Sequence, residues 1–142
     1  MLNDIEIVTD KSFTRINIIG VGGEGGNAIN FLRELYPESM VKAIAINTDN
    51  QDLQKSKADK KILIGESRTR GRGTGANPAV AEKIAEDEID KIRTAIDETD
   101  MAIVCLGLGG GTGSGAGPVV MRAAQQKDIL TLAIVTVPFP FE

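Results

Sequence analysis

The sequence has no histidine, no tryptophan and one cysteine, Cys105. Catalysis by a Ser-His-Asp or Cys-His group is therefore excluded for this chain, as is a metal site with histidine ligands. A single cysteine cannot form an internal disulfide; it also argues against a structural zinc site and fits a reducing compartment. Aromatic residues make up 4% of the chain, so the core must rest on isoleucine, valine, leucine and alanine.

Long apolar segments and an excess of basic charge are missing as well. No segment is apolar for long enough to cross a bilayer, and the N-terminus does not resemble a signal peptide. These features predict a cytoplasmic chain without direct membrane contact. Lys and Arg number 16 and Asp and Glu 20, which gives a net charge of −4. Nucleic acid is not an expected partner, because binding a phosphate backbone needs a basic face.

Strand and helix patterns alternate along the 142 residues, a length that fits one domain. Residues 1–14 are expected to form an N-terminal arm, and residues 15–142 the domain. Short apolar runs predict strands over 15–20, 41–47, 61–64, 101–106 and 130–137. Helical patterns and start signals predict helices over 27–35, 51–57, 78–97 and 113–126, with a loop over 65–77. We therefore expect an α/β fold, a Rossmann-like three-layer sandwich with a parallel sheet of strand order 3-2-1-4-5.

Two glycine-rich segments, residues 20–27 and 107–115, follow the first and the fourth expected strands. A helix N-terminus presents unpaired N–H groups and partial positive charge, and glycine lets the backbone approach a ligand closely. In the expected strand order both segments meet at the carboxyl edge of the sheet, which predicts one phosphate-binding site. Neither segment contains lysine. Backbone amides, helix dipoles, the Thr112 hydroxyl and a cation would have to balance the phosphate charge.

Each segment has an alternative interpretation. The spacing Gly20-x-Gly22-x-x-Gly25, with Asp49 after the second strand, also fits a nicotinamide dinucleotide site, or a tight turn without a ligand. The second segment is not a Walker loop, because it lacks the sequence Gly-Lys-Ser/Thr. A dehydrogenase does not need a glycine-rich segment of this kind after its fourth strand. A flexible linker is disfavoured there, because the segment lies between an apolar strand and an apolar helix.

Other candidate residues are also open to more than one interpretation. Residues 71–78 place small residues before the helix start at Asn77-Pro78, so they either reach a terminal phosphate or only cap the helix. Asp49 either holds a metal-bound water or caps the next helix. Glu142 either contacts a ribose hydroxyl or is a solvated acid. The arginines between 68 and 72 face phosphate, a partner subunit or solvent.

Five segments, in order along nearly the whole chain, resemble motifs of the FtsZ/tubulin family of GTPases. They are residues 20–28, 47–49, 71–78, 109–115 and 138–142. The resemblance implies GTP or GDP and Mg²⁺ as ligands. It implies that residues 23–27 cradle the α- and β-phosphates, that residues 109–113 bind them from the other side and that residues 74–77 sense the γ-phosphate. The implied nucleotide-binding set is Gly22, Gly23, Glu24, Gly25, Gly26, Asn27, Thr74, Gly75, Ala76, Asn77, Gly109, Gly110, Gly111, Thr112, Gly113 and, at the ribose, Glu142.

The resemblance also implies a cellular role. Proteins of this family polymerise head to tail with GTP and build the cytokinetic ring. The chain would correspond to their N-terminal nucleotide-binding half, without the central helix and the C-terminal domain. Asp49 would lie near the magnesium, and the acid that positions the attacking water would come from a neighbouring subunit's second domain. The chain itself would then hold no catalytic residue and would bind nucleotide with little hydrolysis.

The resemblance also implies binding partners, and the sequence differs from the family at two positions. The partner in the full protein would be a second copy, and other division-ring partners would bind through the missing C-terminal regions. Glu24 stands where the family commonly has glycine, and Thr74 where it commonly has alanine. Two other functions stay open at this stage. One is an NAD(P)-binding oxidoreductase domain, and the other is a non-hydrolysing module that regulates assembly.

Overall fold

The computed structural model describes residues 14–141, which form one parallel sheet flanked by helices. The predicted arm lies outside these residues except for Thr14. The five strands pair in parallel in the order β3-β2-β1-β4-β5, which confirms the predicted topology. They are β1 (Ile16–Val21), β2 (Lys42–Asn47), β3 (Lys60–Leu63), β4 (Met101–Gly107) and β5 (Leu130–Thr136).

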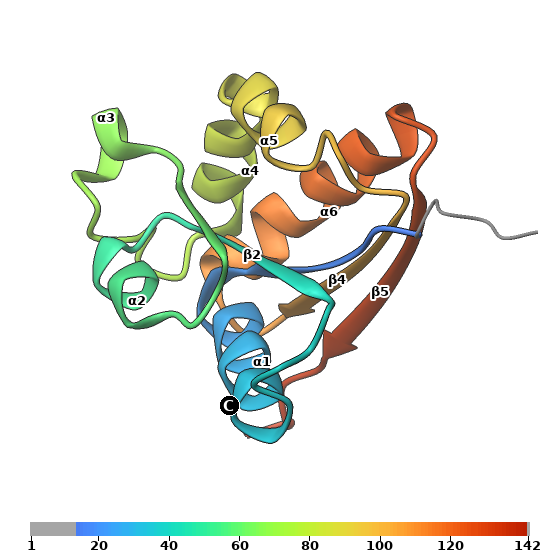
Figure 1. The fold of residues 1–142 in the computed structure, drawn as a ribbon. Helices are drawn as coiled ribbons and strands as arrows, with labels where there is room; N and C mark the ends of the chain where they lie inside the picture. The colour runs from blue at the N-terminus through green and yellow to red at the C-terminus, as the bar shows by residue number, and fades with distance from the viewer. Residues whose placement is uncertain (1–13, 142) are drawn as a thin grey trace, which may run out of the picture.

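The helices complete the predicted three-layer sandwich. They are α1 (Gly22–Leu35), α2 (Asn50–Lys55), α3 (Glu66–Thr69), α4 (Pro78–Asp87), α5 (Ile89–Ala95) and α6 (Gly111–Gln126). In Figure 1, α1 lies below the sheet and α4, α5 and α6 lie above it. Right-handed crossovers between parallel strands require helices on both faces of such a sheet. Among residues 14–141, no helix is both long enough and apolar enough to cross a membrane.

The two faces of β2 differ in side-chain size, and on one of them small residues let a helix approach closely. Ile44 and Ile46 of β2 pack in the large core cluster with α4, α5 and α6, whereas Ala43 and Ala45 pack against α1 and α2. On this second face a Cβ on Gly25 of α1 would collide with the main-chain oxygen of Cys105. Small residues therefore let the first turns of α1 lie directly on the sheet.

Helix α1 begins at Gly22, five residues earlier than predicted, which corrects the expected loop. Glycine has a low helix propensity, so the sequence indicated a loop up to Asn27. Gly22 has a φ of +76°, which lets the chain turn from β1 directly into the helix. The packing of Gly25 against β4 outweighs the poor propensity, so the first segment is the start of a helix rather than a free loop.

Two further predictions in the middle of the chain were wrong. The single helix expected over 78–97 is divided into α4 and α5, because Glu88 leaves the helical conformation, with φ −111° and ψ 25°. Its carboxylate accepts a hydrogen bond from the backbone N–H of Gly65. The apolar spacing gave no sign of this break, since Ile84 and Ile92 enter the same core. The expected loop over 65–77 contains the one-turn helix α3, which buries no residue.

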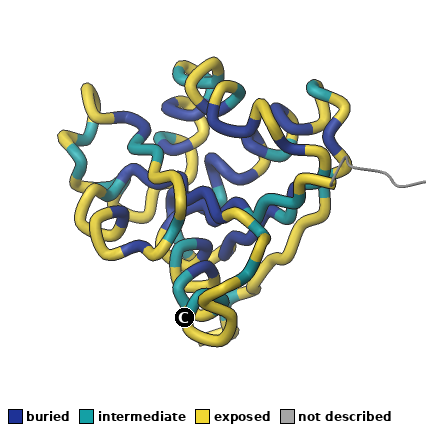
Figure 2. Tube along the Cα trace, viewed as in Figure 1, coloured by how far each residue is buried: buried dark blue, intermediate teal, exposed yellow. Residues whose placement is uncertain are grey.

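Burial is concentrated in the centre of the sheet and the helices that face it (Figure 2). Strand β5 forms one edge and is mostly exposed, including Leu130, Leu132 and Ile134. The carboxyl ends of β1, β2 and β4, by contrast, lead into the segments that the sequence marked as functional.

Candidate functional site

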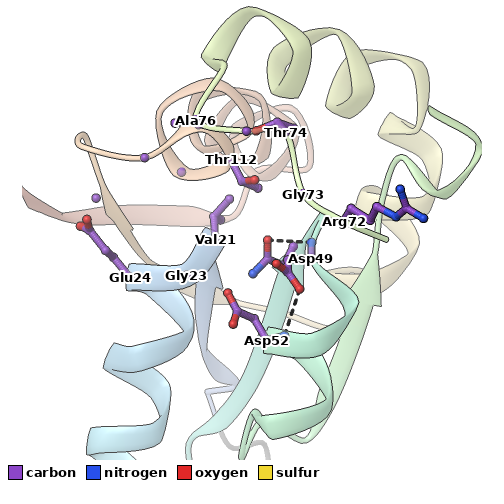
Figure 3. A pocket seen from close by; sticks show the side chains of 16 residues that line it. Val21, Gly23, Glu24, Asp49, Asp52, Arg72, Gly73, Thr74, Ala76 and Thr112 are labelled. Atoms are coloured by element: carbon purple, nitrogen blue, oxygen red, sulfur yellow. Dashed lines mark hydrogen bonds between the residues drawn. The ribbon is translucent and has the colours of Figure 1, made fainter. Parts of the chain in front are cut away.

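A cavity of about 340 Å³ lies at the carboxyl ends of the central strands (Figure 3). Its walls come from both glycine-rich segments and from the loop before α4. The lining residues are Val21, Gly23, Glu24, Asn47, Asp49, Asp52, Arg72, Gly73, Thr74, Gly75, Ala76, Gly107, Gly110, Gly111, Thr112 and Gly113. The structure thus brings segments from across the chain to one site.

The first segment contributes the N-terminus of α1. Gly23 and Glu24 line the cavity. Gly22 and Gly25 are buried beneath its wall, and a Cβ on Gly22 would lie 2.8 Å from the backbone nitrogen of Gly113. The two segments therefore touch through backbone atoms. Gly26 and Asn27, which the resemblance places in the site, continue the helix and are not among the lining residues.

The second segment contributes the N-terminus of α6. Gly110, Gly111, Thr112 and Gly113 line the cavity, whereas Gly109 does not. No side chain within residues 14–141 caps α1 or α6. The first backbone N–H groups of both helices therefore lack the usual side-chain acceptor, at the positions that line the cavity. This arrangement suits an anion, because two positive dipole ends converge on it.

The shape of the second segment depends on Ser114, which sequence reasoning did not single out. Its hydroxyl lies 2.7 Å from the main-chain oxygen of Gly110 and 2.9 Å from that of Leu108. The hydroxyl has one proton and donates it to one of these oxygens at a time, which holds the segment against the first turn of α6. A serine one turn into a helix can bond a carbonyl four residues earlier, which is the signal that would have pointed to it.

The loop before α4 closes a third side of the cavity. Thr74, Gly75 and Ala76 line it. Asn77 does not, and its side chain instead accepts a hydrogen bond from the N–H of Val80 at 3.3 Å as the N-cap of α4. A Cβ on Gly111 would lie 2.7 Å from the backbone nitrogen of Asn77 and would collide with the Thr74 hydroxyl. The loop therefore packs directly on the second segment.

Asp49 lines the cavity and also caps α2. Its Oδ1 accepts hydrogen bonds from the N–H groups of Gln51 at 2.8 Å and Asp52 at 3.2 Å. Asn47 fixes the turn before it, since its Oδ1 accepts from the N–H of Thr48 at 2.8 Å and of Asp49 at 3.1 Å. Capping is thus an observed role of Asp49. Its other oxygen, Oδ2, faces toward the Gly73 side of the cavity, 3.7 Å from where a Cβ of Gly73 would lie.

Asp52 is a lining residue that sequence reasoning missed. It is the third residue of α2, in a stretch that carried only a weak helical pattern. The lining carries three carboxylates, Glu24, Asp49 and Asp52, and one cation, Arg72. Figure 3 shows the Arg72 side chain extending away from the carboxylates. Within residues 14–141, no group of three or more His, Cys, Asp or Glu side chains forms a metal site of its own. Glu142 lies outside the described residues.

Cys105, expected in the core, is buried in β4, and this burial raises the pKa of its thiol. A thiol with a raised pKa is a poor nucleophile at neutral pH. The groups that line the cavity are therefore backbone amides, hydroxyls, carboxylates and the guanidinium of Arg72.

Comparison with known proteins agrees with this geometry. Residues 15–142 match the model of the Tubulin/FtsZ family, GTPase domain. The cell division protein FtsZ of Aquifex aeolicus is 50% identical over 128 residues, which are 90% of this chain and 35% of that protein. The chain thus spans about a third of that relative's length.

Solved structures give the same result. An empty FtsZ dimer from M. jannaschii superimposes with a TM-score of 0.86 at 43% identity, over 92% of this chain and 38% of the other. CetZ2 from Haloferax volcanii, in a protofilament with bound GTPγS, superimposes with a TM-score of 0.81 at 30% identity. The match covers 91% of this chain and 41% of the CetZ2 chain. These similarities do not support the NAD(P)-binding alternative. The chain belongs to the Tubulin/FtsZ family and carries the fold of its GTPase domain.

Proposed function

We propose that this chain binds GTP and GDP, with Mg²⁺, in the cavity between the N-termini of α1 and α6. The observation that carries the proposal is the convergence of two helix N-termini without side-chain caps on one cavity. A polyphosphate chain would be held by backbone N–H groups of residues 23–24 and 110–113. Family membership points to guanine as the base.

Mg²⁺ is proposed because the cavity alone has the wrong charge for a polyphosphate. Three carboxylates and one outward-pointing arginine line it. A hard cation that keeps several waters can bridge phosphate oxygens and carboxylates. Asp49 and Asp52, on the α2 side, would hold such a hydrated ion, which would neutralise phosphate charge.

Several roles implied by the resemblance belong to the same proposal. Residues 74–76 would contact the γ-phosphate, because their loop packs on the start of α6. Glu142 would contact the ribose. Asn77 would act indirectly, because its side chain caps α4 and so helps to hold the preceding loop in place. Gly22 and Gly25 would act by letting the backbones approach one another rather than by touching the ligand.

Hydrolysis and assembly form the second part of the proposal. We infer that hydrolysis needs a water-positioning acid from a neighbouring subunit, so the chain alone turns GTP over slowly if at all. The FtsZ dimer and the CetZ2 protofilament favour head-to-tail self-association for this protein too. The cellular role would be in the division ring, in the cytoplasm, with further partners bound outside these residues.

Calorimetric titration of the chain with GTP, GDP and NAD⁺, with and without Mg²⁺, tests the proposal. We expect GTP and GDP to bind, more tightly with Mg²⁺, and NAD⁺ not to bind. Gly110 offers a clean blocking variant, because its φ is −102° and a Cβ there meets open space. Gly110→Leu should preserve the fold and abolish binding. Gln125→Leu, exposed at the far end of α6, is the matched control. Binding of GTP by Gly110→Leu as by the parent chain would refute the site.

A further inference from the structure

Glu24 is the one acid in the glycine-rich start of α1, and it reaches across the carboxyl edge of the sheet. Its Oε2 accepts a hydrogen bond from the Thr136 hydroxyl at 2.5 Å, although 112 residues separate the two. Thr136 is the last residue of β5. The side chain therefore spans from α1, over the end of β4, to the end of β5.

Gly107 makes room for this crossing. It is the last residue of β4, and a Cβ there would collide with the Glu24 carboxylate. A Cβ on Gly109 would lie 3.7 Å from Glu24 Oε1. The carboxylate thus lies on the backbone at the start of the second glycine-rich segment, at one side of the cavity.

The carboxylate has no cationic partner within residues 14–141, where its one hydrogen bond is to the neutral Thr136 hydroxyl. It lines the cavity and points away from Asp49 and Asp52 (Figure 3). A cation held on the side of those two residues would therefore leave it unneutralised. An anion is favourable in the first turn of a helix, which accounts for its position there.

We propose that Glu24 is a built-in anionic competitor at this site, which weakens nucleotide binding in proportion to the ligand's negative charge. This inference rests on the proposed function. The negative charge of the carboxylate partly cancels the positive potential at the N-terminus of α1, which would otherwise attract phosphate. It also repels the phosphate chain, and the repulsion grows with each added charge. Glu24 thereby reduces the ratio of the affinity for GTP to the affinity for GDP.

Glu24→Gln tests the proposal, because the amide oxygen still accepts the Thr136 hydrogen bond and only the charge is lost. By calorimetry at low ionic strength, we expect the variant to bind GTP on the order of tenfold more tightly than the parent chain, and GDP with a smaller gain. Raising the salt to about 0.5 M should shrink both gains, since exposed charges are screened over a few ångströms there. The gains should persist without Mg²⁺.

Two further variants separate charge from shape. Glu34→Gln removes the same charge from the last turn of α1, where Glu34 pairs with Lys57 at 3.2 Å. It should leave both affinities unchanged. Thr136→Val keeps the charge and removes the hydrogen-bond donor, so it should not raise the affinity for GTP or GDP.

The outcomes are distinct. If Glu24→Gln binds GTP no better than the parent, or more weakly because the carboxylate holds a cation or a ribose hydroxyl, the inference is overturned while the proposed function stands. An equal gain from Glu34→Gln or Thr136→Val also overturns it. If neither the parent nor Glu24→Gln binds GTP or GDP, the proposed function itself fails, and the inference fails with it.

Discussion

The side-chain hydroxyls of Thr48, which is buried, and Thr112, which lines the cavity, lie 2.8 Å apart, although 64 residues separate them. Thr48 is 0% exposed and Thr112 8% exposed. The pair ties the end of β2 to the first turn of α6. A hydroxyl donates one hydrogen bond and accepts up to two. Thr112 can therefore donate to a phosphate oxygen only while Thr48 donates to Thr112.

Replacement of Thr48 by valine should cost both stability and affinity. It keeps the shape but leaves the buried Thr112 hydroxyl without this partner, for a loss of about 1–3 kcal/mol in the free energy of unfolding. Without the Thr48 donor, the Thr112 hydroxyl is no longer polarised and oriented toward the ligand, so GTP affinity should fall as well. Urea unfolding and calorimetry measure the two effects. Thr112→Ser is the control that retains both hydroxyls, and if it loses as much as Thr48→Val, the hydrogen-bond explanation is wrong.

Glycines in the two segments should respond in opposite directions to alanine. A Cβ on Gly115 would collide with the main-chain oxygen of Pro78, where α6 crosses α4. Overpacking of this kind costs about 1–3 kcal/mol or more. A Cβ on Gly26 meets nothing within 4 Å in α1, and Gly26→Ala should stabilise the helix by about 0.5–1 kcal/mol. The free energies of unfolding of the two variants in urea give the comparison, and equal effects would contradict the packing at α4.

Acid should weaken the fold through Asp100, among other carboxylates. Its pKa is lowered by hydrogen bonds from the Arg15 side chain and backbone N–H, and by the charge of Arg15. Because the folded-state pKa lies below the unfolded value of about 3.9, the stabilisation is present above that value and is lost as the pH falls through the folded pKa.

The variant Asp100→Asn should therefore lose less stability than the parent chain between about pH 5 and pH 2. The variant and the parent are compared by urea midpoints across this range. Asp90→Asn is a control at a carboxylate whose side chain is 95% exposed. Parallel pH curves for Asp100→Asn and the parent would show that the ion pair contributes nothing in this range.

The exposed edge strand should make the chain self-associate. Leu130, Leu132 and Ile134 alternate along β5 and pair with the β4 residues that face α1, but α1 does not cover them. An exposed apolar edge strand is a template for pairing and aggregation. Ile134→Lys should shift sedimentation velocity profiles at high concentration toward the monomer. Lys61→Glu on the opposite edge strand β3 is the charge-altering control. If Ile134→Lys leaves the association unchanged, the contact between copies lies elsewhere.

The segments that sequence reasoning placed correctly are those whose signal is local. Most strands are short apolar or β-branched runs, and Asn77-Pro78 marks the start of α4 through its own capping chemistry. The break at Glu88 could not be predicted, because the apolar spacing continues through it and the hydrogen-bond partner of the Glu88 carboxylate, the N–H of Gly65, lies 23 residues earlier. The early start of α1 was missed for the same reason, since propensity does not register the close packing of Gly25 on β4.

The sequence by itself determined the order of the strands and their topology, and with them the meeting of two glycine-rich helix starts at one edge, because these follow from local patterns and chain handedness. Only the tertiary structure decided which side chains face the cavity. It added Asp52 to the wall of the cavity and paired Thr48 with Thr112. It also laid Glu24 across Gly107 to Thr136. Such contacts join residues far apart in the chain, and no spacing within one segment encodes them.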